Sequence, residues 1–154
     1  MEGFRDYSLP PGFWRISYDD EAVTAVTHLD SSSPEGVASP LSDKAAEELS
    51  LYMEGKLKSF SFPVKASGTP FQERVWKALL SIPYGERVTY REIAVRIGRP
   101  RAVRAVGAAI GKNRLGIVVP CHRVVPGKGG DGNYNGGRET KRLLLELEKE
   151  YKEK

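Results

Sequence analysis

Two closely spaced helix-start signals constrain the fold of this chain more than any other feature of its sequence. The segments TPFQ at 69–72 and TYRE at 89–92 each place a threonine three residues before a glutamine or glutamate, which is the pattern of a capping box. The second helix is expected to span 89–97, because Gly98 offers the left-handed position at which helices end. A further helix follows from Arg99-Pro100 to about residue 111. Two short helices joined by a glycine-containing turn are typical of a helix-turn-helix.

Hydrophobic patterns predict the other elements of this half. Apolar residues at helical spacing extend the helix that starts at Thr69 to Ile82. Residues 117–119 predict a short buried strand that ends at Pro120. A glycine-rich loop then leads to a last helix from Arg138 to about Lys152. This helix is expected to bury Leu143, Leu144 and Leu147.

The first part of the chain predicts a small sheet and one helix. Two alternating segments predict a β-hairpin, at 13–18 and 22–29. Residues 41–54 have helical spacing, with Ser42 or Asp43 as the expected cap. Phe60, Phe62 and Val64 alternate as a third strand, and the chain changes character at 65–68. The interpretation is an α/β (α+β) protein with a sheet-plus-helix domain at 1–66 and a helical domain at 67–154.

The charge is distributed unevenly between these two parts. Residues 1–66 carry 6 Lys/Arg and 11 Asp/Glu, a net charge of −5, whereas residues 67–154 carry 18 and 9, a net charge of +9. This asymmetry favours contact between the second part and a polyanion, although a dipolar surface without a partner is the alternative. The helix after Pro100 is rich in Ala and Gly, and Arg101 and Arg104 project from it. We expect it to enter a nucleic-acid groove, with close helix packing as the alternative.

The N-terminus and the cysteine count bound the cellular setting. The first six residues are polar and acidic, so they do not predict a secretory signal, and no apolar run is long enough for a membrane span. Cys121 is the one cysteine, which excludes an internal disulfide. We therefore expect a cytoplasmic protein. The thiol is either a small buried apolar group or a reactive nucleophile.

The residues next to Cys121 favour the reactive thiol. His122 follows it directly, and a nearby imidazole can take the proton of a thiol. Adjacent side chains point in opposite directions along an extended segment, so the pair needs a turn after Pro120 or a bridging water. A histidine in this role needs a carboxylate to fix its tautomer, and Glu148 is the candidate. The alternative for Glu148 is a surface ion pair with Lys152.

The segment Pro120-Cys121-His122-Arg123-Val124 resembles the active-site motif of the O6-alkylguanine-DNA alkyltransferases. Other elements of that family fall at the matching spacing: Tyr90, RAVG at 104–107, Asn113, the GNYNGG loop at 132–137 and LLLELE at 143–148. The match is dense from about Thr69 to Glu148, while the first 66 residues match only in general layout.

The resemblance implies a winged-helix-like helix-turn-helix domain that carries the active site and binds double-stranded DNA through the minor groove. It implies one-turnover transfer of an alkyl group, from O6-alkylguanine and also from O4-alkylthymine, to Cys121. No cofactor and no obligate protein partner are implied, so a monomer is expected. Some members hold a structural zinc in the N-terminal part. This chain has no cysteine there and only His28, so no metal is expected.

The resemblance also implies roles for individual residues. His122 would take the thiol proton through a water, Glu148 would stabilise the imidazolium, and Tyr90 would donate to the N3 edge of the leaving guanine. Arg104 would hold the space left by the flipped base, with a phosphate contact as the alternative. The remaining expected binding residues are Arg101 at the DNA, Asn113 at the turn, Val124 at the exocyclic amine, Lys141 beside Tyr90, and Tyr134 and Asn135 at the pocket.

Two further positions depart from the family pattern. Arg114 stands where proline is common, so the loop that enters the active-site segment is expected to differ. Asn135 stands where serine is common, which puts a side-chain contact with O6 in doubt.

Three other readings remain open from the sequence. A winged-helix regulator with a structural cysteine explains the basic domain but not the histidine next to the cysteine. A lesion-binding protein without transfer activity conflicts with the presence of Cys121. A cysteine hydrolase would need a second catalytic histidine, and His28 lies in the other domain.

Overall fold

The computed structural model describes residues 2–127, 134 and 136–153, and these form two compact units. The first unit contains the chain up to Ala66 together with Arg114–Val118, and the second contains Ser67–Asn113 and the chain from Val119 onward. We expected all of 67–154 to form the second domain. The segment Arg114–Val118 groups with the first unit because it hydrogen-bonds to Val26, whose amide donates to the Arg114 carbonyl at 2.8 Å.

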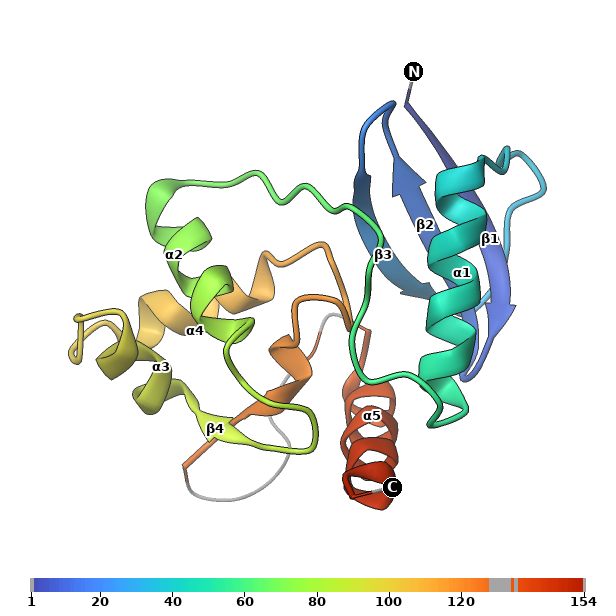
Figure 1. The fold of residues 1–154 in the computed structure, drawn as a ribbon. Coiled ribbons are helices and arrows are strands. Elements are labelled where there is room, and N and C mark those ends of the chain that lie inside the picture. Colours follow the sequence, from blue (N-terminus) through green and yellow to red (C-terminus); the bar gives the residue numbers. More distant parts are fainter. Residues whose placement is uncertain (1, 128–133, 135, 154) are drawn as a thin grey trace. The chain divides into compact units, whose positions relative to one another are not determined.

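The first unit is built on an antiparallel sheet. Strands β1 (Gly3–Leu9), β2 (Gly12–Tyr18) and β3 (Val23–Leu29) pair in that order within the described residues (Figure 1). The β2–β3 hairpin follows the predicted alternation, and its register sets Ile16 opposite Val26.

The sheet differs from the prediction in one missed strand and one wrong strand. Strand β1 was not predicted, because its residues are only half-buried and include charged side chains. Residues 60–64 do not form the third strand, and only Val64 makes an isolated bridge, to Val23. Pro63 has no amide hydrogen, so this segment contributes its carbonyl to the Val23 amide at 2.9 Å instead of a regular ladder.

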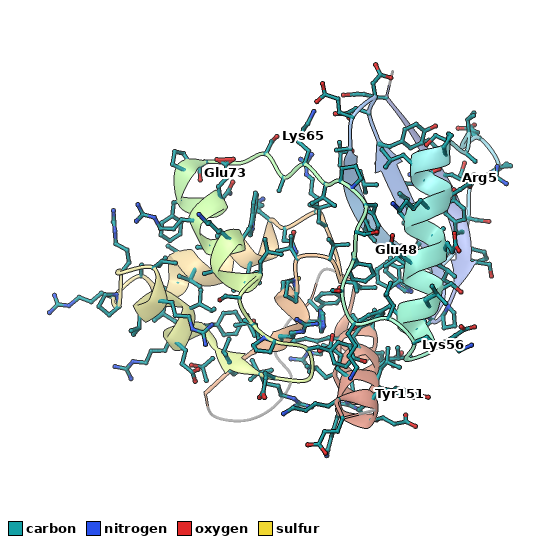
Figure 2. All side chains as sticks on the ribbon, viewed as in Figure 1. Arg5, Glu48, Lys56, Lys65, Glu73 and Tyr151 are labelled. Atoms are coloured by element: carbon teal, nitrogen blue, oxygen red, sulfur yellow. The ribbon has the colours of Figure 1, made fainter. Side chains whose placement is uncertain are left out.

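Helix α1 (Pro40–Met53) lies along one face of the sheet (Figure 1). Its cap is Ser39 and not Ser42 or Asp43, because Pro40 occupies the first helical turn and Ser42 closes a capping box with Ser39. Tyr52 and Leu49 are buried on the face toward the sheet. Glu48 projects from α1 (Figure 2). Its carboxylate accepts from the amide and hydroxyl of Ser61, at 2.7 and 2.6 Å.

In the second unit, three short helices pack against one another: α2 (Pro70–Leu79), α3 (Tyr90–Arg96) and α4 (Val103–Gly111). Thr69 and Thr89 cap α2 and α3 as the sequence predicts, and Gly98 has a left-handed φ of 75°. Helix α4 begins later than expected, because Arg99-Pro100 lies in a turn in which Ala102 donates to the Arg99 carbonyl. Trp76 donates its indole N–H to the Ala109 carbonyl at 2.8 Å and joins α2 to α4.

The acidic and basic side chains of these helices lie on the outside. Glu73 in the first turn of α2 is exposed, which suits the positive end of the helix dipole (Figure 2). None of the helices in the described part of the chain has the length and hydropathy that a membrane span requires.

The segment that leads to Cys121 is not the predicted strand. Ile117 has a φ of 69°, in the left-handed region, so the residues 117–119 cannot continue an extended ladder. The regular pairing begins after the cysteine instead. Strand β5 (Val124–Val125) pairs in parallel with β4 (Val88–Thr89), which immediately precedes Tyr90.

Helix α5 (Arg138–Tyr151) closes the second unit, and Tyr151 is its last residue (Figure 2). We expected Leu143, Leu144 and Leu147 to be buried. Only Leu144 is, because the inward face follows the helical spacing 141, 144, 145 and 148. Leu143 is exposed and Leu147 is half-buried. Two charged residues therefore lie on the buried face, Lys141 and Glu148.

Candidate active site

A single helical turn presents the cysteine and the histidine. Pro120 has φ −79° and ψ 61°, which turns the chain into the 3-10 helix η1 (Cys121–Arg123). The two neighbouring side chains are therefore not forced to opposite faces, as they would be along a strand. Both side chains are buried in the second unit.

Asn113 holds Cys121 from the end of α4. Its amide Nδ2 donates to the Val119 carbonyl at 3.0 Å and to the Cys121 Sγ at 3.3 Å. Burial raises the pKa of the Cys121 thiol, while the Asn113 hydrogen bond and the positive charge of Lys141 act in the opposite direction. The buried thiol is therefore protonated at neutral pH and needs a base to become a nucleophile.

The carboxylate of Glu148 lies against the imidazole of His122. His122 Nε2 and Glu148 Oε2 are 2.8 Å apart, and both side chains are buried. Burial alone would raise the pKa of Glu148, but its contacts with His122 and Arg123 lower it well below the usual range. The ionised carboxylate can only accept, so Nε2 carries the hydrogen and Nδ1 does not. Nδ1 is buried and makes no hydrogen bond to the described residues.

Arg123 is the site residue that the sequence interpretation missed. Its Nε donates to Glu148 Oε1 at 2.8 Å, and its Nη2 donates to Oε2 at 2.9 Å. Its Nη1 donates to the Ile82 carbonyl at 2.7 Å. The Gly85 amide also donates to Glu148 Oε1, at 3.1 Å. The signal for Arg123 was its position between His122 and two valines, where a solvated side chain is not expected.

Lys141 brings a second buried cation to the site. Its side chain has no exposed area, and its Nζ donates to the Val124 carbonyl at 2.7 Å. Tyr90, the first residue of α3, is half-buried. Burial and the nearby Cys121 raise the pKa of its phenol. The ring of Tyr134 meets His122 edge-on at a centroid distance of 6.5 Å.

Two of the remaining expected binding residues lie on the surface. Arg104 is exposed on α4, and Arg101 is exposed in the turn before it. Gly107 lies on the inner side of α4, where an added Cβ would be 3.9 Å from the Tyr90 ring. Arg114 is exposed and belongs to the first unit. Asn135 lies outside the described residues.

The second unit thus brings together one thiol, one imidazole, one carboxylate and two cations in a buried cluster. The cluster can take a proton from Cys121 and hold the resulting positive charge on His122 against Glu148. No group of three His, Cys, Asp or Glu side chains in the described residues could hold a metal ion.

The chain is similar to known proteins. A family model described as 6-O-methylguanine DNA methyltransferase, DNA binding domain, matches residues 70–150. The methylated-DNA–protein-cysteine methyltransferase of Methanosarcina barkeri is 51% identical over 105 residues, and the inducible one of Bacillus subtilis is 55% identical over 104 residues. Each alignment covers 68% of this chain, and the chain spans 66% and 58% of the length of these two relatives.

A solved structure matches the chain over almost its full length. The crystal structure of Mycobacterium tuberculosis OGT in complex with DNA superposes with a TM-score of 0.87 at 42% identity. The superposition covers 96% of this chain and 93% of that one.

Proposed function

The chain belongs to the 6-O-methylguanine DNA methyltransferase family, and on that premise we propose that it repairs DNA by moving an alkyl group from O6 of guanine to its own Cys121. O4-alkylthymine is a second substrate of the same chemistry. The observation that carries this proposal is the buried thiol of Cys121 beside a His122–Glu148 pair at 2.8 Å. The names of the relatives and the DNA complex of the similar structure support it.

The first step is proton transfer from the thiol. His122 accepts the proton of Cys121 at Nδ1 through a water, and Glu148 stabilises the imidazolium through Nε2. The thiolate then attacks the alkyl carbon in line with the C–O6 bond. The new S–C bond forms as the C–O6 bond breaks, and the bonding electrons stay on the guanine.

The leaving guanine must be neutralised. Tyr90 donates a hydrogen bond or a proton to its N3 edge, and Lys141 assists through its positive charge near Cys121. The Val124 carbonyl, already held by Lys141, accepts from the exocyclic amine of the base. Tyr134 lines the pocket. Because a thioether is a very poor leaving group, the thiol is not regenerated and each molecule acts once.

The helix-turn-helix delivers the base to this site. Helix α4 enters the minor groove, because Ala and Gly along it allow close approach. Arg104 occupies the stack after the damaged base flips out, and Arg101 contacts the backbone. Asn113 holds the turn between α4 and the active-site segment. We further propose that the protein acts as a monomer, without a cofactor or a metal, in the cytoplasm.

Intact-protein mass spectrometry tests the proposal directly. The protein is mixed with a duplex that carries one O6-methylguanine, and a Cys121→Ala variant is run in parallel. We expect one added methyl group per molecule, located on Cys121 by peptide mapping, and none on the variant. An unmodified wild-type protein that is folded and binds the duplex would contradict the transferase assignment and leave a DNA-binding module.

A further inference from the structure

Arg123 has no part in the proposed reaction, yet all three of its guanidinium nitrogens donate hydrogen bonds within the fold. The residue is 8% exposed, and Nε, Nη1 and Nη2 each donate a hydrogen bond of 2.7 to 2.9 Å. A buried arginine is costly unless its geometry is well satisfied, and this one could be replaced by an apolar side chain if only packing mattered. Its position implies a role at the carboxylate that it grips.

The guanidinium fixes where the Glu148 carboxylate stands. Two parallel N–H donors to the two carboxylate oxygens define the plane of the carboxylate as well as its distance. The third donor anchors the arginine to the Ile82 carbonyl, in the turn that also supplies the Gly85 amide. One oxygen, Oε2, is thereby directed at His122 Nε2.

The guanidinium also changes what the carboxylate does to the imidazole. A lone carboxylate would favour the charged imidazolium strongly, and the histidine would then be occupied by a proton before the thiol could give one. Burial is the largest influence on His122 and lowers its pKa, the contact with Glu148 raises it, and the nearby charges of Arg123 and Lys141 lower it further. The other groups that face the pair are Cys121, the Tyr134 ring edge, and Tyr84 beside Arg123.

We propose that Arg123 is a positioning residue that acts through Glu148, holding His122 as a neutral base with its hydrogen on Nε2 and Nδ1 able to accept the thiol proton. This inference rests on the proposed function, in which His122 is that base. The structure supplies the chain of contacts for it, from the Ile82 turn through Arg123 and Glu148 to His122.

The test follows the ionisation of His122 directly. The chain has two histidines, so nitrogen NMR of the imidazole rings resolves His122 with His28 as an internal reference. In the wild-type protein we expect the Nε2–H tautomer at neutral pH. An Nδ1–H tautomer or a charged ring at pH 7 in the wild-type protein would overturn the proposal without any variant.

Two substitutions separate charge from geometry. In Arg123→Gln, which removes the cation, we expect the His122 titration midpoint to rise by about one pH unit or more. The acid limb of Cys121 alkylation by iodoacetamide should move to higher pH by the same amount. Arg123→Lys keeps the charge but loses the two parallel hydrogen bonds to Glu148. In this variant we expect the His122 titration midpoint to stay near the wild-type value, while alkylation of Cys121 slows about tenfold. Arg15→Gln is the matched control, because Arg15 makes a similar two-point pair with Asp6 in the other unit.

Each outcome decides the proposal. A folded Arg123→Gln protein with unchanged His122 titration would refute the electrostatic role. If that variant does not fold, the Arg123→Lys protein decides the geometric role. Alkylation of Cys121 at the wild-type rate, with the wild-type tautomer of His122, would refute it. Iodoacetamide needs no DNA and meets only one cysteine, so these readouts are independent of alkyl transfer from DNA. Absent methyl transfer with the expected His122 behaviour would place the failure in the proposed function and not in the control of His122 by Arg123.

Discussion

Replacing Glu148 by glutamine tests the buried charge cluster most severely. The carboxylate accepts from Arg123 twice, from the Gly85 amide and from His122, within 3.1 Å in each case. Glutamine is nearly the same size, but an amide NH2 group takes the place of one of the two carboxylate oxygens. This NH2 group then points at an N–H donor that it cannot accept from. The guanidinium then remains buried without its counter-charge.

The expected cost follows from the burial. Glu148 is 1% exposed, so water cannot take over its contacts. Removing one partner of a buried ion pair costs about 3 to 5 kcal/mol of unfolding free energy. This loss is a large part of the roughly 5 to 15 kcal/mol typical of a domain, but it leaves a folded protein that can be measured. Glu146→Gln, an exposed site on the same helix, should change the free energy by less than about 0.5 kcal/mol.

Urea denaturation measures the difference, and its pH dependence adds a second check. The folded pKa of Glu148 lies below the ordinary glutamate value of 4.5, so ionisation stabilises the native state. That contribution is complete above about pH 4.5 and is lost as the pH falls below that value toward the folded pKa. The gap between wild type and Glu148→Gln should therefore be constant from pH 5 to pH 8 and shrink in acid. A gap below about 1 kcal/mol with an unchanged m-value would refute the reasoning.

Three further predictions concern the thiol and the DNA. In Asn113→Ala the unfolding free energy should fall by about 1 to 3 kcal/mol, because the Val119 carbonyl loses its donor, and the pKa of Cys121 should rise, as read from the pH dependence of iodoacetamide alkylation. Arg104→Ala should slow repair of duplex DNA far more than reaction with the free modified base, and equal losses would exclude a role in base flipping. Duplex affinity should fall steeply and linearly with the logarithm of salt concentration, and a flat response would argue against the basic unit as the DNA surface.

Local signals predicted a large part of the fold. The caps at Thr69 and Thr89, the turn at Gly98 and the β2–β3 hairpin each depend on residues a few positions apart, so the sequence contains the whole cause. Elements that depend on a distant partner were missed or misread. Strand β1 needs β2 to pair its polar side chains, as Asp6 does with Arg15 at 2.8 Å.

Two segments that were predicted as strands are buried but do not pair as strands. Residues 60–64 and 117–119 have the apolar pattern of strands, but a pattern establishes burial and not pairing. Both segments bury apolar side chains, Phe62 in the first and Ile117 in the second. Neither forms a ladder, because Pro63 lacks a donor and Ile117 adopts a positive φ. Burial without regular pairing satisfies the same hydrophobic requirement.

The site illustrates the same division between local and distant causes. Cys121 and His122 stand out from the sequence alone, whereas the choice of Glu148 stayed open between a catalytic carboxylate and an ion pair with Lys152. In the structure Lys152 pairs with Glu86 at 2.8 Å, and Glu148 contacts His122. Arg123 and Glu148 are 25 positions apart, so only the packing of α5 against η1 reveals their contact.

The balance of charge around the thiol connects this packing to the chemistry. With His122 neutral, Arg123 offsets the charge of Glu148, and the buried ammonium of Lys141 then adds positive potential near Cys121. A buried anion is strongly disfavoured without such a field. In the proposed reaction an anion forms at this place twice, first as the thiolate, when His122 carries the proton, and then as the departing guanine. We expect the ammonium of Lys141 to stabilise both anions, because a fixed cation requires no rearrangement between the two stages.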